Sequence, residues 1–322
     1  MIELRQAICD RTKADYGLEY EATQAVVASG AKHMVYIALA ALVDPGDEVI
    51  VPAPYWVSYY EMVRLFGGVP VVVNVSEEQG FQLTPEQLEQ AITDKTKAII
   101  LNNPSNPTGA VYPKEALKAV ADVCVKHDLY IISDEIYDKL VYDGVPFTSV
   151  AALSDEIKAH TILINGVSKT YAMTGWRLGY ACGPAPIIKI MTKIHQSAIM
   201  SAPTTSQYAA ITALKDCDGE IERMRNEYNM RRRLVVKSFN DMGLSCFEPR
   251  GAFYAFPCIK SSGMTSEEFC TKLLEQKHVA IIPGNAFGAS GEGYARVSYA
   301  YSVEHLMEAL RRIREFLSEN VK

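Results

Sequence analysis

One nearly uncharged stretch, NGVSKTYAMTGWRLGY at residues 165–180, holds a lysine and an arginine. Lys169 follows a predicted strand in a loop rich in Gly, Ser and Thr, and Arg177 lies eight positions further on. A partly desolvated lysine has a lowered pKa and becomes an amine nucleophile toward aldehydes. Arg177 offers a fixed cation that can hold a phosphate in bidentate geometry. A loop lysine taken alone is more often simply solvated, but few charges surround Lys169.

A carboxylate and a phenol form a second group, in LYIISDEIYDKL. Asp134 directly follows a buried apolar strand, where the active-site groups of α/β sheets lie. Opposite a pyridine ring, this carboxylate would keep the ring nitrogen protonated, so that the ring can accept electrons. Tyr137 could place its hydroxyl near a phenolate oxygen of the same ring. Taken singly, the two residues also fit a helix N-cap and a core tyrosine.

An Asn- and Pro-rich segment, NNPSNPTG at residues 102–109, follows another predicted strand. Its composition alone indicates a turn. Within that turn, Asn106 could donate hydrogen bonds to a cofactor oxygen and to a substrate carboxylate.

A fourth segment places small residues at the start of a helix. The predicted strand in VVASGAKHMVYIALAAL leads to Gly30, Ala31 and Lys32, where backbone N–H groups could reach a phosphate. Many strand–helix junctions share this pattern, so it is weak evidence by itself. Shortly afterwards, Trp56 could lie against an aromatic ring, or it could be an ordinary buried tryptophan.

The elements that must position these groups alternate between strands and helices. Six runs rich in Val and Ile predict strands: DEVIVPAP, VPVVVNV, KAIILNNP, LYIISDE, HTILING and RLGYACGP. Most are continuously apolar, which is typical of buried, largely parallel strands. Helix starts are predicted between them at Thr84, by a capping box, and at Pro113. The alternation predicts an α/β sheet with helices on both sides.

The pattern changes after about residue 205. A long charged helix, EIERMRNEYNMRRRLVVKSFNDMG, precedes a short β region at GAFYAFP. A helix opened by Thr265, the segment VAIIPG, the strand YARVSYA and a helix from about Ser302 follow. We expect a large cofactor-binding domain at 1–225 and a small α+β domain at 226–322. The Arg231–Arg233 run is expected to line a solvated helix face.

Composition narrows the class of protein. The 322 residues suit two domains, and a net charge of −6 does not favour nucleic acid or an anionic membrane as partner. The longest apolar run, Met34 to Val43, is too short to span a bilayer. Seven scattered cysteines, without a C-x-x-C pair, predict reduced thiols in a cytoplasmic protein. No motif points to a metal site.

Together these segments resemble the fold-type I, pyridoxal phosphate (PLP)-dependent aminotransferases of class I/II, in particular the bacterial aspartate, aromatic and prephenate aminotransferases. The resemblance runs in the same order along essentially the whole chain, through SGAK, PYWVSYYEMV, NNPSNPTGAVYPKE, SDEIYDKLVYDG, GVSKTYAMTGWRLGYACGP, PRGAFYAFP and ARVSYA. It implies a three-layer α/β/α large domain with a mainly parallel sheet and a smaller α+β C-terminal domain. It also implies PLP as cofactor, and a homodimer with the active site at the subunit interface.

The resemblance assigns roles to the residues above. Lys169 would form the Schiff base with PLP and carry the proton during catalysis. Asp134 would pair with the pyridinium nitrogen, and Trp56 would stack on the ring. Tyr137 and Asn106 would hydrogen-bond the phenolate oxygen.

The two ends of the substrate site follow from the same resemblance. Arg177 and the helix start at Gly30, Ala31 and Lys32 would hold the cofactor phosphate. Arg296 would bind the substrate α-carboxylate, together with Asn106. Lys32 occupies the position that contacts the distal carboxylate in relatives with acidic substrates, which favours aspartate and 2-oxoglutarate.

The sequence departs from the family pattern in two places. Gly166 stands where some relatives carry a phosphate-binding serine. The first residues, MIELRQAICDRTK, resemble a stretch well inside the pattern, so several dozen upstream residues are expected to be absent. Those residues would include a loop over the substrate and a tyrosine that reaches the neighbouring subunit's phosphate.

Three functional hypotheses remain open. The favoured one is ping-pong transamination between an amino acid and a 2-oxo acid. The second is a C–S β-lyase on the same fold, which would release pyruvate and ammonia from cystathionine without an oxo acid. The third is a PLP-binding protein with little activity, which would bind cofactor without turnover.

Overall fold

A seven-stranded sheet forms the centre of the large lobe in the computed structural model, which describes residues 1–321. The strand order is β1-β7-β6-β5-β4-β2-β3. The strands from β2 to β6 run parallel, whereas β7 is antiparallel to β6 and β1. Their bounds are β1 (Ala25–Ala28), β2 (Glu48–Ala53), β3 (Val69–Asn74), β4 (Thr96–Asn102), β5 (Tyr130–Asp134), β6 (Thr161–Gly166) and β7 (Gly179–Cys182). All six strands named from sequence are present, and the mainly parallel α/β fold is confirmed.

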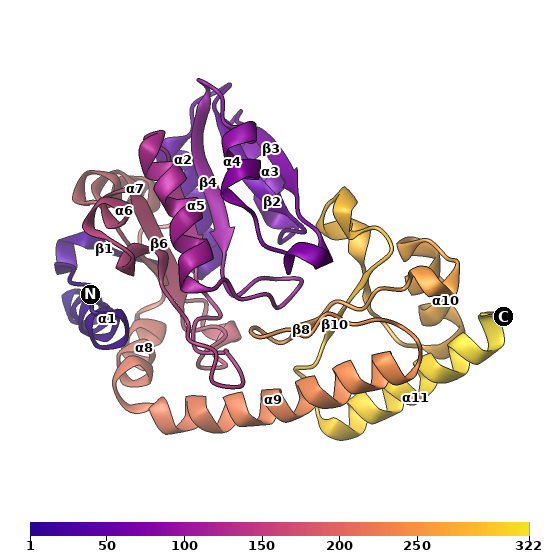
Figure 1. Cartoon of the computed structure of the whole chain (residues 1–322). Coiled ribbons are helices and arrows are strands. Elements are labelled where there is room, and N and C mark those ends of the chain that lie inside the picture. Colours follow the sequence, from indigo (N-terminus) through magenta and orange to yellow (C-terminus); the bar gives the residue numbers. More distant parts are fainter. Residues whose placement is uncertain (322) are drawn as a thin grey trace.

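Helices cover both faces of this sheet (Figure 1). One face packs on α2 (Ala31–Leu42), α3 (Ser58–Leu65) and α7 (Ala185–Ala198). The other packs on α4 (Pro85–Ala91), α5 (Lys114–Lys126) and α6 (Asp155–His160). Successive residues of a strand point to opposite faces, so Val49 and Val51 enter the first core and Ile50 the second. Continuous apolar runs are therefore required, except at edge strand β3, where Val69 and Val72 are exposed.

The N-terminal residues form a helix that was not predicted from the sequence. Helix α1 (Ile2–Tyr16) packs with α8 (Thr204–Asp216) against β1, β6 and β7. Leu4 and Ile8 are fully buried there, beside Leu163 and Tyr180. This pair of helices completes the second face of the sheet.

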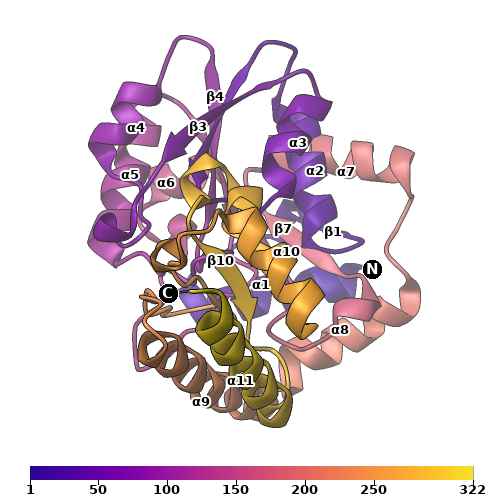
Figure 2. The ribbon, with the colours of Figure 1, turned by 90° about the vertical axis from the view of Figure 1, so that its right-hand side faces the viewer.

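A smaller α+β lobe follows, with its own core. It contains a three-stranded antiparallel sheet of order β8-β10-β9, and Figure 2 shows its β10, α10 and α11 in front of the large sheet. The elements are α9 (Asp218–Asp241), β8 (Tyr254–Ala255), α10 (Ser266–Lys277), β9 (Ile282–Pro283), β10 (Ala295–Ser298) and α11 (Val303–Asn320). Thr84, where a capping box was predicted, and the predicted helix starts Thr265 and Ser302 all accept backbone hydrogen bonds.

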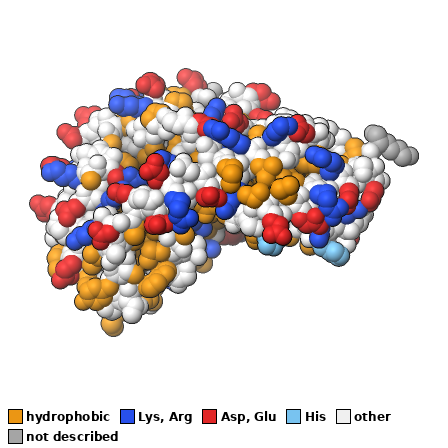
Figure 3. All heavy atoms as spheres, turned by 90° about the horizontal axis from the view of Figure 1, so that it is seen from below, with side chains coloured by type: hydrophobic (Ala, Val, Ile, Leu, Met, Phe, Trp, Pro, Cys, Tyr) orange, Lys and Arg blue, Asp and Glu red, His pale blue; other side chains and the backbone are white. Residues whose placement is uncertain are grey.

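Helix α9 joins the two lobes and runs along one side of the molecule (Figure 1). The boundary proposed between residues 225 and 226 falls inside this helix. Figure 3 shows basic and acidic side chains interspersed over the face that carries α9 and α11. Within residues 1–321, no helix is long and apolar enough to cross a bilayer.

The expectation of a solvated face for Arg231–Arg233 is wrong for Arg232. Its side chain is only 1% exposed, whereas Arg233 is exposed. Arg232 donates to Glu248 Oε1 at 2.9 Å and to the Pro249 carbonyl at 3.1 Å, and it also bonds Asp143. The reason is that α9 lies against loops of both lobes, so one face of a charged helix turns inward.

The Asp143 carboxylate accepts hydrogen bonds from Asn229, Arg232 and Arg233. Arg233, and then Asn229 and Arg232, hold the pKa of Asp143 at about 2, against the opposing effect of burial. Two neighbouring arginines of α9 thus bind one carboxylate, one from a buried position and one from solvent.

This difference predicts unequal effects of two substitutions. Arg232→Ala should lower the free energy of unfolding by about 2–4 kcal/mol, because Glu248 and the Pro249 carbonyl lose their buried donor. Arg233→Ala, the matched control, should cost less than about 1 kcal/mol, since its ion pair is solvent-exposed. Urea unfolding of both variants measures the two values. Equal losses would contradict the burial of Arg232.

Candidate functional site

The carboxyl ends of β4, β5 and β6 open into a cavity of about 340 Å³. Asn102 ends β4, Asp134 ends β5, and Lys169 follows β6. Tyr254 from β8 and Arg296 from β10 close the cavity from the small lobe. The cavity therefore lies where the large sheet meets the small one.

The structure brings together nearly all the residues that the sequence singled out. The predicted residues that line the cavity are Ala31, Lys32, Trp56, Asn106, Asp134, Tyr137, Lys169, Arg177 and Arg296. Gly30 is not in the lining. Among residues 1–321, no group of three or more His, Cys, Asp or Glu side chains is placed to hold a metal ion.

Lys169 is half-buried between aromatic rings. Its Nζ lies 5.4 Å from the centroid of Phe253 and 6.0 Å from that of Tyr137. Burial lowers the pKa of Lys169, and the positive charges of Arg177 and Arg296 lower it further, against a smaller effect of Asp134. A larger fraction of the amine is therefore neutral than for an exposed lysine, which is what a nucleophile toward an aldehyde requires.

Asp134 is held by two donors on its buried carboxylate. The Tyr59 hydroxyl donates to Oδ2 at 2.6 Å, and the Ile136 N–H donates to Oδ1 at 3.2 Å. Burial raises the pKa of Asp134, while the bond from Tyr59, the bond from Ile136 and the charge of Lys169 oppose that rise. A cation placed against this carboxylate would favour its ionised form.

Tyr59 is a site residue that the sequence interpretation missed. It lies on α3, is buried, and its ring meets the Trp56 ring edge-on at 5.3 Å. No local pattern pointed to Tyr59, because the Asp134 carboxylate that it bonds lies 75 positions further along the chain.

An anion cradle forms where α2 begins. Gly30 has φ +95°, and a Cβ added to it would lie 2.6 Å from Arg177 Nη2. Because Gly30 has no side chain, the Arg177 guanidinium can approach the first turn of α2. Arg177 Nη1 donates to the Thr174 carbonyl at 2.8 Å. The helix N-terminus and a fixed guanidinium together suit a phosphate.

The glycine at position 166 also has a structural reason. A Cβ at Gly166 would lie 2.9 Å from both Gly179 Cα and the Leu178 carbonyl oxygen, so no serine fits without a backbone shift. A different hydroxyl is available, because Ser168, next to Lys169, lines the cavity and is buried. The sequence interpretation had assigned no role to Ser168.

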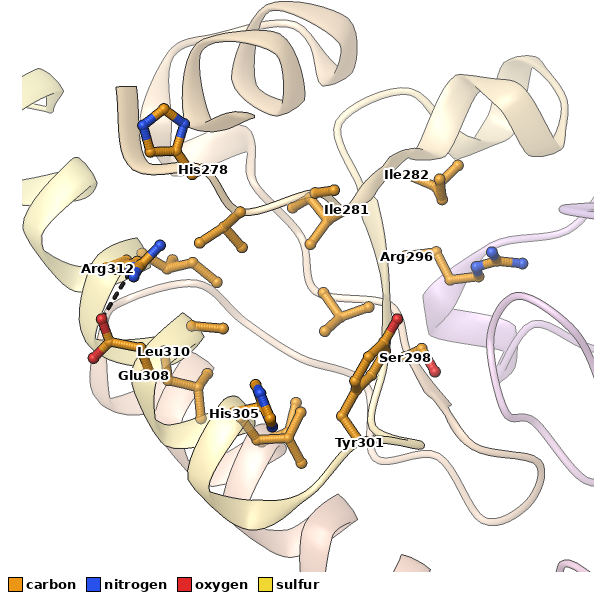
Figure 4. A pocket seen from close by; sticks show the side chains of 17 residues that line it. His278, Ile281, Ile282, Arg296, Ser298, Tyr301, His305, Glu308, Leu310 and Arg312 are labelled. Carbon is orange, nitrogen blue, oxygen red and sulfur yellow. Dashed lines mark hydrogen bonds and ion pairs between the residues drawn. The ribbon is translucent and has the colours of Figure 1, made fainter. Parts of the chain in front are cut away.

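Arg296 closes the opposite end of the cavity. Its Nη1 donates to Asn106 Oδ1 at 2.9 Å, and its guanidinium lies 4.5 Å from the Tyr254 ring and 4.8 Å from the Phe287 ring. Figure 4 shows Arg296 at the edge of a second cavity, between α11 and β10, with its guanidinium directed away from that cavity. Only the family resemblance, and no local pattern, pointed to this arginine.

Tyr137 and Lys32 occupy contrasting environments. The Tyr137 hydroxyl is buried and lies 3.1 Å from the Tyr254 hydroxyl. Lys32 is exposed at the rim, with its Nζ 5.1 Å from the Trp56 ring. Tyr254 is a further site residue that was missed, although its segment GAFYAFP carried part of the resemblance.

Known proteins are similar to this chain in sequence and in fold. The family model described as aminotransferase class I and II matches residues 1–313. The aspartate aminotransferase of Geobacillus stearothermophilus is 46% identical over 320 residues, which cover 98% of this chain and 81% of the relative. The aspartate aminotransferase of Bacillus subtilis (strain 168) is 44% identical over 326 residues, covering 99% and 82%.

Solved structures of other proteins have the same fold as this chain. The aromatic aminotransferase from Pyrococcus horikoshii OT3 superposes with a TM-score of 0.97 at 45% identity, covering 99% of this chain and 86% of that one. The aspartate aminotransferase from Thermus thermophilus with maleate gives a TM-score of 0.94 at 41% identity, covering 98% and 81%.

Proposed function

Since the chain belongs to the class I and II aminotransferases, we propose that it transfers the amino group of aspartate to 2-oxoglutarate with PLP bound at Lys169. The observation that carries the proposal is the half-buried Lys169 amine, with its lowered pKa, in one cavity with Asp134 and Arg177. These three groups match the aldehyde, the ring nitrogen and the phosphate of one cofactor.

The donor set of the cavity fits PLP at each position. PLP supplies an aldehyde carbon and a pyridine ring that accepts electrons from the substrate. Asp134 would pair with the ring nitrogen, and Trp56 would cover the ring. The start of α2 at Gly30, Ala31 and Lys32 would hold the phosphate together with Arg177.

Lys169 also handles the proton. Its neutral Nζ would accept the proton from the substrate Cα and later return it. The lowered pKa of Lys169 increases the fraction of amine able to do so. Tyr137 and Asn106 are assigned to the cofactor phenolate oxygen.

The two carboxylates of the substrate would occupy opposite ends of the cavity. Arg296, oriented by Asn106, would bind the α-carboxylate through a bidentate pair. Lys32 at the rim would bind the distal carboxylate, which favours aspartate and 2-oxoglutarate over purely aromatic substrates.

The proposal extends to assembly and location. A homodimer with the site at the interface is supported by exposed apolar side chains, Trp176 next to Arg177 among them, at 46% exposure. A cytoplasmic location is supported by seven free cysteines. Two domains, 1–225 and 226–322, are supported by the separate core of the small lobe.

The central test removes the amine. In the wild type, adding aspartate should shift the cofactor absorbance band, and 2-oxoglutarate should reverse the shift. Lys169→Ala should lower turnover about a thousandfold or more, because nucleophile and proton carrier are lost together. Lys215→Ala, an exposed lysine on α8, is the control and should behave as wild type. Undiminished turnover in Lys169→Ala would refute the proposal.

The same measurement separates the alternatives. Pyruvate and ammonia released from cystathionine without an oxo acid would indicate the C–S lyase. A bound cofactor whose band never responds to any amino acid would indicate the inactive binding protein.

Tyr59→Phe tests the support of Asp134. Without the Tyr59 hydroxyl, the pKa of Asp134 rises further and its carboxylate becomes a weaker partner for the ring nitrogen. Cofactor affinity should fall about tenfold, as expected for a hydrogen bond to a charged group. Tyr60→Phe, on the same helix but stacked on Tyr55, is the control. Equal cofactor dissociation constants for both variants would contradict the role of Tyr59.

Lys32→Ala tests the substrate class. The KM for aspartate should rise about three- to fivefold, the range of a solvent-exposed ion pair, because the distal carboxylate loses its cation. The KM for an aromatic amino acid, measured on the same variant, should stay unchanged. A parallel rise for both substrates would remove Lys32 from the specificity argument.

A further inference from the structure

Tyr254 and Arg296 lie on the same face of the small sheet. Strands β8 and β10 are antiparallel, with Tyr254 opposite Ser298. Arg296 is two residues before Ser298, so it is the diagonal neighbour of Tyr254 on that face. The Arg296 guanidinium lies 4.5 Å from the centroid of the Tyr254 ring, within the range of a cation–π contact.

The hydroxyl of Tyr254 reaches the large lobe. It lies 3.1 Å from the Tyr137 hydroxyl, and both side chains are buried. Tyr137 follows β5, three residues after Asp134. One side chain therefore contacts the carboxylate-binding arginine through its ring and a cofactor-binding phenol through its hydroxyl.

Phe287 is a second aromatic neighbour of Arg296. Its ring centroid is 4.8 Å from the guanidinium, and it lies in a short 3₁₀ helix, Gly284–Phe287. Aromatic faces suit this arginine, because a carboxylate neighbour would neutralise the charge that the substrate needs. The rings fix the guanidinium while leaving its N–H groups to Asn106 and the substrate.

We propose that Tyr254 is a positioning residue with two separable parts: its ring orients Arg296 for the substrate carboxylate, and its hydroxyl orients Tyr137 for the cofactor oxygen. The inference rests on the proposed function. Because Tyr137 donates to the cofactor oxygen, it accepts from Tyr254, and that bond makes Tyr137 the stronger donor. The charged and titratable groups that act on Tyr137 are Tyr254, Asp134, Arg296 and Tyr59, and Lys169 lies over its ring.

Three variants of the cofactor-loaded enzyme separate the two parts. Tyr254→Phe keeps the ring and removes the hydroxyl, Tyr254→Leu removes both, and Phe287→Leu removes only the second aromatic ring beside Arg296. Two readouts independent of turnover are the dissociation constant of maleate, a dicarboxylate that cannot be transaminated, and the pH midpoint of the cofactor absorbance change.

Each variant has its own expected pattern. Tyr254→Phe should bind maleate within about twofold of wild type, since the ring remains over Arg296. Its absorbance midpoint should move to higher pH. Without the Tyr254 hydroxyl, the negative charge on the cofactor oxygen is less stabilised, so the Lys169 nitrogen bound next to that oxygen would keep its proton to a higher pH. Phe287→Leu should weaken maleate about three- to tenfold with an unchanged midpoint. Tyr254→Leu should show both changes.

An unchanged midpoint in Tyr254→Phe, or an equal loss of maleate affinity in Tyr254→Phe and Tyr254→Leu, would overturn the inference. If Tyr254→Leu does not fold, Tyr254→Phe and Phe287→Leu still decide it, since their expected patterns are opposite. Failure of the proposed function looks different, because the wild type itself would then lack a cofactor band that responds to aspartate.

Discussion

The site depends on a carboxylate buried at the carboxyl end of β5. Asp134 is 4% exposed, and an ionised carboxylate in such a place is costly unless donors and a nearby cation compensate. The donors come from Tyr59 on α3 and from the backbone just after the strand. The sheet places the strand end, and α3 has to pack where its tyrosine meets that end. Strand order and helix position are thus linked through one side chain.

Around this carboxylate the cavity is predominantly cationic. Lys169 and Arg177 come from the loop after β6 and Arg296 comes from β10, and all three line the cavity together with Asp134. Burial, and then the charges of Arg177 and Arg296, lower the pKa of Lys169. These positive charges attract anions. The Lys169 amine is the proposed nucleophile, and the two arginines are the proposed binding groups. The two arginines are fixed differently, one beside a helix start and one between aromatic rings.

Much of this architecture could be predicted from local sequence. Apolar runs identified six strands because buried parallel strands need both faces apolar, and a capping box at Thr84 identified a helix start. Lys169 and Asp134 could be placed in one cavity because carboxyl ends of parallel strands share an edge.

The residues that sequence reasoning missed have partners far along the chain. Tyr59 bonds a residue 75 positions away, and Tyr254 one 117 positions away, so no local spacing reveals either contact. Arg232 was misjudged for the same reason: the loops that bury it lie 89 and 16 positions from it. A charged helix looks solvated in sequence until the neighbour that covers one face is known.

Helix α9 carries a mechanical consequence. It is a continuous helix of 24 residues through the proposed boundary, and Arg232 fastens it to loops at Asp143 and Glu248. Asp143 belongs to a loop of the large lobe and Glu248 to a loop of the small lobe, so Arg232 bridges the two lobes by side-chain bonds. The lobes are therefore joined at this place twice, once through the continuous backbone of α9 and once through one buried guanidinium.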